Sequence, residues 1–150
     1  MERIDTLRAT FRYQYYDQGD FATPDMYKAD VRKEEKSHIR FPLRPPAYAV
    51  VEYKAPWKLS RTLTFDETEE LTALLNDTAS YVWGEVGTAE YDVHITFYDS
   101  MDKVIGLTNV DYDNVGQTYS YPTVKRMKWG GPTKTALNRL IEIIEGTDPR

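Results

Sequence analysis

Four polar side chains alternate along one predicted strand and could together transfer protons. Asp92, His94, Thr96 and Tyr98 are spaced two residues apart, which places them on one face of a strand. A carboxylate, an imidazole and a phenol side by side are suited to general acid–base catalysis. The only other histidine is His38, and no nucleophile motif accompanies the set. We therefore interpret these residues as a polar sheet face and predict no catalytic residues and no enzyme.

A second candidate is a calcium loop that begins at Asp111. Asp111, Asp113 and Gly116 match the first, third and sixth positions of an EF-hand loop. The fifth position is Val115, and Pro122 replaces the bidentate glutamate at the twelfth. Asp, Asn and Gly are also the residues that β-turns require. We therefore predict a turn here, with no metal site, and the absence of phosphate-binding and dinucleotide-binding motifs predicts no cofactor.

The composition excludes several classes of protein. The chain has 150 residues, 24 acidic against 19 basic side chains, and no cysteine. A chain of this length suits one domain with a buried core, so we expect residues 1–150 to form a single domain. The longest apolar run covers only residues 47–51, which predicts no transmembrane segment. The net charge of −5 disfavours nucleic acid as a partner.

The start of the chain bears on localisation. Residues 1–5 contain no apolar stretch of the kind that a signal peptide needs. We therefore expect a cytoplasmic protein if the chain is complete. If an export signal has been removed from the sequence, we expect a periplasmic protein. In that case an exported accessory domain is an alternative function.

Acidic and tyrosine side chains concentrate in one part of the chain. Residues 66–114 contain twelve acidic residues and one basic residue, and tyrosine contributes 12 of the 20 aromatic residues of the chain. Helix capping and turns explain several of these acids. Asp92 and Asp111, however, fall on predicted strands near Tyr98 and Tyr112. An acidic sheet face that carries tyrosines is typical of a surface that binds a basic protein, although a merely solvated face is the alternative.

Several patterns predict the strands that would position these residues. Alternation predicts strands over residues 7–15, 57–65 and 91–97, and an apolar run predicts a buried strand over 47–53. Turns at 17–20, 99–103 and 113–116 separate the strands, and the last two delimit further strands of a meander over 104–112 and 117–121. Residues 21–36 form either a short helix or a loop. Trp57, Leu59, Leu63 and Phe65 would share the buried face of their strand. Arg61 lies on that face too, so it must extend out to solvent, pair with a carboxylate or mark a register break.

Two amphipathic helices complete the pattern. The first follows Phe65 and ends near residues 76–77, with either Asp66 and Glu69 or Thr64 and Glu67 as its capping pair. The second opens at residues 130–132 with Pro132 as its first residue. It carries an apolar stripe and ends at Gly146. These elements predict an α+β domain of two layers, in which a five- or six-stranded, mainly antiparallel sheet has both helices on one face and the other face open.

Four short strings near the end of the chain carry a resemblance to known proteins. They are ITFYD at residues 95–99, KVIGL at 103–107, YSYP at 119–122 and MKWGG at 127–131. In these strings the chain resembles short bacterial proteins, mostly without an assigned function, some of which give immunity to interbacterial toxins. The resemblance implies a toxin-neutralising binding protein and assigns no role to any single residue.

We therefore expect a protein-binding module, in its most specific form a bacterial immunity protein that occludes the active site of a toxin. The predicted partner-binding residues lie on the acidic sheet face and its turns: Asp92, His94, Tyr98, Asp99, Asp102, Asp111 and Tyr112. The alternative is a ligand-binding or enzymatic domain. Its pocket would lie between the sheet and the helices and would be lined by tyrosines with Trp83 or Trp57.

Overall fold

The described residues form seven strands, two α-helices and one short 3-10 helix. The computed structural model describes residues 41–83, 90–111, 116–121 and 130–146. In chain order the elements are β1 (Tyr48–Tyr53), β2 (Arg61–Leu63), α3 (Phe65–Asn76), η1 (Thr78–Ser80), β3 (Tyr81–Trp83), β4 (Val93–Tyr98), β5 (Val104–Asp111), β6 (Gln117–Tyr121), β7 (Gly130–Pro132) and α5 (Lys134–Glu145).

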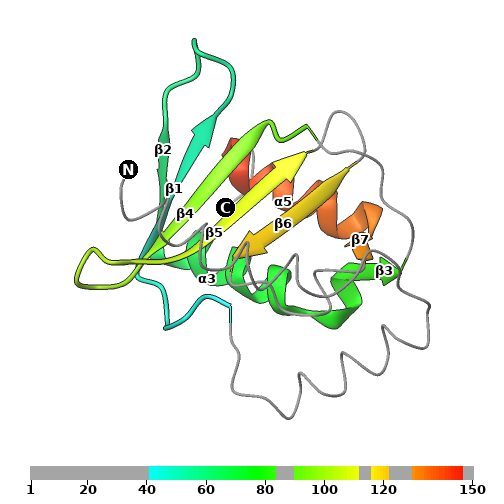
Figure 1. Ribbon diagram of the computed structural model, residues 1–150, viewed down its shortest axis with the longest axis horizontal. Helices are drawn as coiled ribbons and strands as arrows, with labels where there is room; N and C mark the ends of the chain where they lie inside the picture. The colour runs from blue at the N-terminus through cyan, green and yellow to red at the C-terminus, as the bar shows by residue number, and fades with distance from the viewer. Residues whose placement is uncertain (1–40, 84–89, 112–115, 122–129, 147–150) are drawn as a thin grey trace, which may run out of the picture.

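The strands form two antiparallel sheets. The larger has the order β2-β1-β4-β5-β6, and the smaller pairs β3 with β7. Both helices lie behind the larger sheet in Figure 1 and cover a single face of it. The predicted α+β class is therefore confirmed. So are the strands near residues 47–53, 104–112 and 117–121 and the hairpin turn at 99–103.

The face of the sheet that contacts the helices forms the core. Alternate residues of β1 and β4 point to this face, among them Val51 and Ile95, which are paired in register. They are fully buried against both helices, as are Leu71 of α3 and Ile144 of α5. Burying one such side chain contributes about 1.5–3 kcal/mol, so this apolar layer is the main source of stability.

The opposite face of the sheet is open only in part. On β1 and β4, side chains such as Glu52 and His94 retain solvent exposure. On β5, Leu107 is 1% exposed and Asp111 is 0% exposed. The face predicted to be open is therefore buried along β5, and on β1 and β4 it is exposed only in part, since Thr96 between His94 and Tyr98 is buried.

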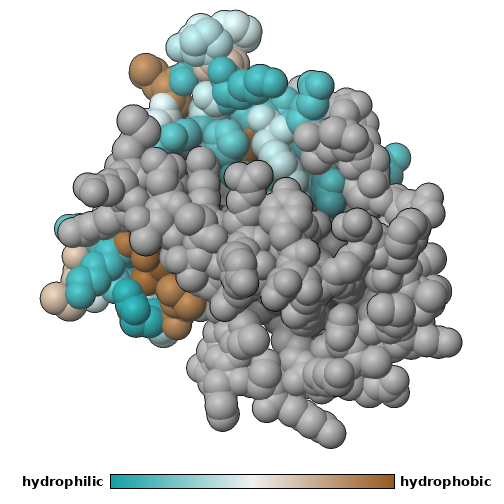
Figure 2. All heavy atoms as spheres, viewed as in Figure 1, coloured by the Kyte–Doolittle hydropathy of each residue, from teal (hydrophilic) through white to brown (hydrophobic). Residues whose placement is uncertain are grey.

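The hairpin of β1 and β2 differs from its prediction. Only Arg61–Leu63 pair with β1, because residues 54–60 leave the sheet as a loop that includes Pro56, which has no amide hydrogen to donate. Of the four residues predicted to share a buried face, only Leu63 is buried. Trp57 is 81% and Leu59 is 89% exposed at the end of the hairpin, and Phe65 begins α3. Figure 2 shows pale spheres at the top of the molecule, where this hairpin ends, with brown, hydrophobic spheres beside them at the upper left.

The start of α5 also differs from its prediction. Gly130–Pro132 form β7 rather than the first helical residues, because their extended backbone pairs with Tyr81–Trp83. Thr133 is the N-cap, and its side chain accepts a hydrogen bond from the Ala136 amide at 3.1 Å. The apolar stripe and the left-handed C-cap at Gly146 are confirmed.

The start of α3 confirms one of the two predicted capping pairs. The Thr64 side chain accepts from the Glu67 amide at 3.2 Å, and the Glu67 carboxylate accepts from the Thr64 amide at 3.1 Å. This reciprocal arrangement is a capping box. The predictions for residues 7–36 and for residues 113–115 of the last turn lie outside the described residues, while Gly116, the final residue of that turn, has the positive φ of 64° that such turns require.

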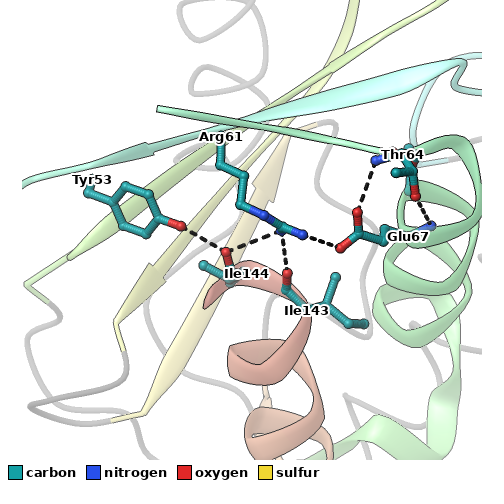
Figure 3. Close-up of polar contacts among 7 residues, drawn as sticks. Tyr53, Arg61, Thr64, Glu67, Ile143 and Ile144 are labelled. Carbon is teal, nitrogen blue, oxygen red and sulfur yellow. Dashed lines mark hydrogen bonds and ion pairs between the residues drawn. The ribbon is translucent and has the colours of Figure 1, made fainter. Parts of the chain in front are cut away.

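Arg61 joins the hairpin to both helices (Figure 3). Its guanidinium donates to the carbonyl oxygens of Ile143 at 2.7 Å and Ile144 at 3.5 Å, and it forms an ion pair with Glu67. Tyr53 from β1 donates to the same Ile144 carbonyl at 2.8 Å. A cation therefore meets the carbonyl end of α5, where the helix dipole favours positive charge. Of the three alternatives for Arg61, pairing with a carboxylate is confirmed.

We expect Arg61→Ala to lower the free energy of unfolding by about 2–4 kcal/mol, because it leaves a buried carboxylate and two helix carbonyls without their donor. Urea denaturation at neutral pH measures the change. Arg139→Ala is the matched control. Arg139 has the same exposed side-chain fraction but pairs with the more exposed Glu70 and Glu142, so its loss should cost about 1 kcal/mol or less. Equal losses in the two variants would contradict the bridging role of Arg61.

The same contacts make stability depend on pH. Burial opposes the charged form of Glu67, but hydrogen bonds from Arg61 and Thr64 outweigh it and lower the pKa of this carboxyl below its ordinary 4.5. The ion pair therefore contributes fully above that value, and its contribution is lost as the pH falls through the lowered pKa.

We expect Glu67→Gln to be less stable than the parent at about pH 6 and to lose less stability on acidification to about pH 3. Denaturation curves at the two pH values test this expectation. Glu69→Gln, which changes an exposed carboxylate on the same helix, should keep the pH dependence of the parent.

Candidate binding surface

The seven predicted partner-binding residues separate into groups along β4. Tyr98 lies at one end of this strand, directly before the turn that contains Asp99 and Asp102. Asp92 immediately precedes β4 at its other end, about 20 Å away at the usual rise of a strand. His94 lies between the two ends, and Asp111 ends the neighbouring strand β5. Tyr112 lies outside the described residues.

Two tyrosines stack at the turn end of the strand. The rings of Tyr48 and Tyr98, which are paired across β1 and β4, lie 5.0 Å apart with an interplanar angle of 10°. The Tyr48 hydroxyl donates to Asp102 Oδ1 at 2.7 Å, and this bond, together with smaller effects of burial and neighbouring charges, raises the pKa of Tyr48 to about 12. Burial, with a smaller effect of the Glu52 carboxylate, raises the pKa of Tyr98. Both rings are therefore neutral, and the contacts hold them in fixed positions.

Asp99 builds the turn beside this stack. Its Oδ1 accepts the amides of Met101 at 2.9 Å and Lys103 at 3.0 Å, and its Oδ2 accepts from Arg44 at 3.0 Å. These partners lower the pKa of Asp99, with the Lys103 amide as the largest cause and burial in opposition. The carboxylate is thus used internally, and Met101, 73% exposed, occupies the outer side of the turn.

His94 is held by an amide rather than by the predicted acid. Its Nδ1 lies 2.6 Å from Asn109 Oδ1 on β5, and because that oxygen accepts, the ring donates through Nδ1. Within the described residues, the ring makes no hydrogen bond to Asp92 or Tyr98. The carboxylate, imidazole and phenol that alternate in the sequence are thus not assembled into a hydrogen-bonded chain.

Asp111 lies inside the protein. It is fully buried, and its Oδ2 accepts the Glu90 amide at 2.9 Å. It therefore does not present its charge to a partner in this structure. Among the described residues there is no group of three or more side chains able to hold a metal ion, while the rest of the loop considered for calcium, residues 112–115, lies outside them.

What remains exposed is a strip along β1 and β4, on the sheet face that the helices leave uncovered. We call it the tyrosine strip and define it by five residues, each at least partly exposed: Tyr48, Val50, Glu52, His94 and Tyr98. Met101 and Asp102 adjoin its turn end. At the lower left of Figure 2, where this turn lies, brown and teal spheres occur side by side.

A pocket lies at the other end, beneath the exposed hairpin. Its volume is about 490 Å³. It is lined by Tyr53, Lys54, Ala55, Trp57, Lys58, Asp92 and Glu145. Tyr53 comes from the sheet and Glu145 from the last turn of α5. The pocket therefore lies where the end of the sheet meets the end of this helix. Of the two tryptophans considered for such a pocket, Trp57 lines it. The side chain of Trp83 lies outside the described part of the structure.

Sequence reasoning missed three residues of these surfaces. Tyr48 lies in the strand predicted over residues 47–53, and its alternation with the buried Ala49 and Val51 is the signal that could have placed it on the open face. Met101 lies in a turn and gave no periodic signal. Lys58 has its amine 2.5 Å from Glu145, 87 positions away in the sequence, and no local pattern shows such a contact.

Comparison with protein families, curated proteins and solved structures found no significant match for this chain. None of the described helices is long and apolar enough to cross a membrane. The proposals below therefore depend on the geometry of the tyrosine strip and of the pocket.

We expect Asp102→Asn to lower the pKa of Tyr48 from about 12 toward its ordinary 10, because the hydrogen bond to the carboxylate is the largest cause of the shift. Ultraviolet difference titration measures the ionisation of tyrosines. The change should disappear when Asp102→Asn is made in a Tyr48→Phe background. A titration curve unchanged by Asp102→Asn would contradict the contact.

Proposed function

We propose that this protein is a protein-binding module whose partner presents a basic surface. In its most specific form it is a bacterial immunity protein that occludes the active site of a toxin. The stacked pair of Tyr48 and Tyr98, fixed by Asp102 and bordered by exposed Met101, is the observation that carries this proposal.

The strip has the composition of a binding hot spot. Tyrosine is enriched at interfaces because a rigid ring buries a large area while its hydroxyl still forms hydrogen bonds. The stack and the Asp102 bond already restrict both rings, so less side-chain entropy is lost on binding. Methionine adapts its shape to irregular partners. These properties support a contact whose strength comes from aromatic burial.

Charge would act mainly on the rate of association. Glu52 and Asp102 are exposed on or beside the strip, and Asp92 is partly exposed beyond its far end. Asp99 and Asp111 are buried, so the acidic character of the surface is weaker than the sequence alone predicts. Carboxylates at the rim speed the approach of a basic partner more than they increase final affinity.

We expect Tyr98→Ala to weaken binding of the stoichiometric partner by about 10- to 100-fold, mainly through faster dissociation. The partner is to be captured from the native host, with the product of the adjacent reading frame as the first candidate. Asp102→Lys should slow association and reduce its dependence on salt. Surface plasmon resonance measures both rates.

Glu69→Lys is the matched control, since it makes the same charge reversal at an exposed position of α3, outside the strip, and should leave both rates unchanged. The proposal fails if no stoichiometric basic partner is captured, or if Tyr98→Ala binds as the parent does. Loss of binding in all three variants would indicate a general effect of mutation and would also count against the strip.

A second candidate function is binding of a small ligand in the hairpin pocket. Its volume lies in the range of small-molecule sites, and it combines aromatic with charged walls. A thermal-shift screen against metabolite mixtures separates the two functions. A clear stabilisation by a free metabolite would favour this second candidate.

A further inference from the structure

Lys58 occupies a site in the hairpin pocket that is built for a cation. Its amine lies 4.4 Å from the centroid of the Tyr53 ring and 2.5 Å from Glu145 Oε2. An ammonium over an aromatic face and against a carboxylate combines a cation–π contact with an ion pair. The position of Lys58 thus indicates that this pocket accepts a positively charged side-chain group.

The walls of the site are fixed by the fold. The Tyr53 hydroxyl donates to the Ile144 carbonyl at 2.8 Å, which orients the ring. Glu145 is the last residue of α5, and Asp92, the residue before β4, adds a second carboxylate. Trp57, largely exposed, stands at the rim of the pocket and could cover an occupant.

The charge balance favours a cation once Lys58 withdraws. Among the described residues, two lysines, Lys54 and Lys58, and two carboxylates, Asp92 and Glu145, line the pocket, so their formal charges cancel. Without the Lys58 amine, this described lining carries a formal charge of −1. The Lys58 side chain is 41% exposed on a loop outside the sheet, so its amine has a route into solvent.

We propose that the hairpin pocket binds a lysine or arginine side chain of the protein partner, which displaces the Lys58 amine from Tyr53 and Glu145. This inference rests on the proposed function, since it takes the partner to be basic. Lys58 acts as an internal competitor. It keeps the pocket closed to weak cations and yields to a side chain that the tyrosine strip holds in place.

The test uses the full-length protein without its partner and N-acetyl-arginine amide as the probe. Binding is followed by Trp57 fluorescence, with Trp57→Phe to identify the signal. We expect Lys58→Met to bind the probe about tenfold more tightly than the parent, because an internal competitor lowers apparent affinity by the fraction of sites it occupies. Adding Glu145→Gln to Lys58→Met should abolish this gain.

Lys54→Met is the matched control. It removes the same charge from the same loop but no cation–π contact, so it should change the affinity by less than about threefold. Equal gains in Lys54→Met and Lys58→Met would overturn the inference, because net charge alone would then explain them. Thermal unfolding of each variant confirms that it is folded.

Two further outcomes would also overturn it. If tetramethylammonium binds Lys58→Met and the arginine probe does not, the pocket takes a small quaternary cation rather than a partner side chain. If neither cation binds Lys58→Met, the pocket is no cation site. Failure of the proposed function gives a different result from failure of this inference. In that case Tyr98→Ala would leave capture of a partner unchanged, whether or not the pocket binds the arginine probe.

Discussion

The guanidinium of Arg61 is the contact on which the arrangement of this molecule depends. It lies on the helix-facing side of a three-residue edge strand and binds the carbonyl end of α5 and the first turn of α3 at once. A Cβ at Gly146, the left-handed C-cap of α5, would approach its Nε to 3.1 Å, so the cap is shaped around the arginine. One cation therefore fixes both helices relative to the edge of the sheet.

Both candidate surfaces follow from this arrangement. Because Tyr53 shares the Ile144 carbonyl with Arg61, its ring forms a wall of the pocket, and Glu145 follows one residue later. The helices cover one face of the sheet, so partly exposed residues of β1 and β4 on the other face become the tyrosine strip. The strip lies on the uncovered face of β1 and β4, whereas the pocket lies past the end of these strands and is walled by Tyr53 and Glu145 from the helix-facing side. A partner that contacts both must therefore extend around this end of the sheet.

The distribution of charge changes the interpretation of the acidic segment. In the sequence, residues 66–114 look like one strongly negative surface. In the structure, Glu67 pairs with Arg61, Asp99 pairs with Arg44 and organises a turn, and Asp111 is buried. Much of the acidity thus serves capping and turn formation, where carboxylates compensate backbone amides. The features that distinguish the exposed surface are aromatic and methionine side chains.

The sequence by itself determined the elements whose signals are local. An apolar run predicted β1 and alternation predicted β4. One of two candidate capping pairs, Thr64 with Glu67, gave the start of α3, and Gly146 predicted the end of α5, because each signal depends on residues a few positions apart. Only the tertiary structure decided which acids remain exposed, that Trp57 leaves the sheet, and that Lys58 meets Glu145. Those outcomes depend on contacts between residues distant in the chain and on the number of residues over which β2 pairs with β1. Neither of these factors produces a periodic pattern in the sequence.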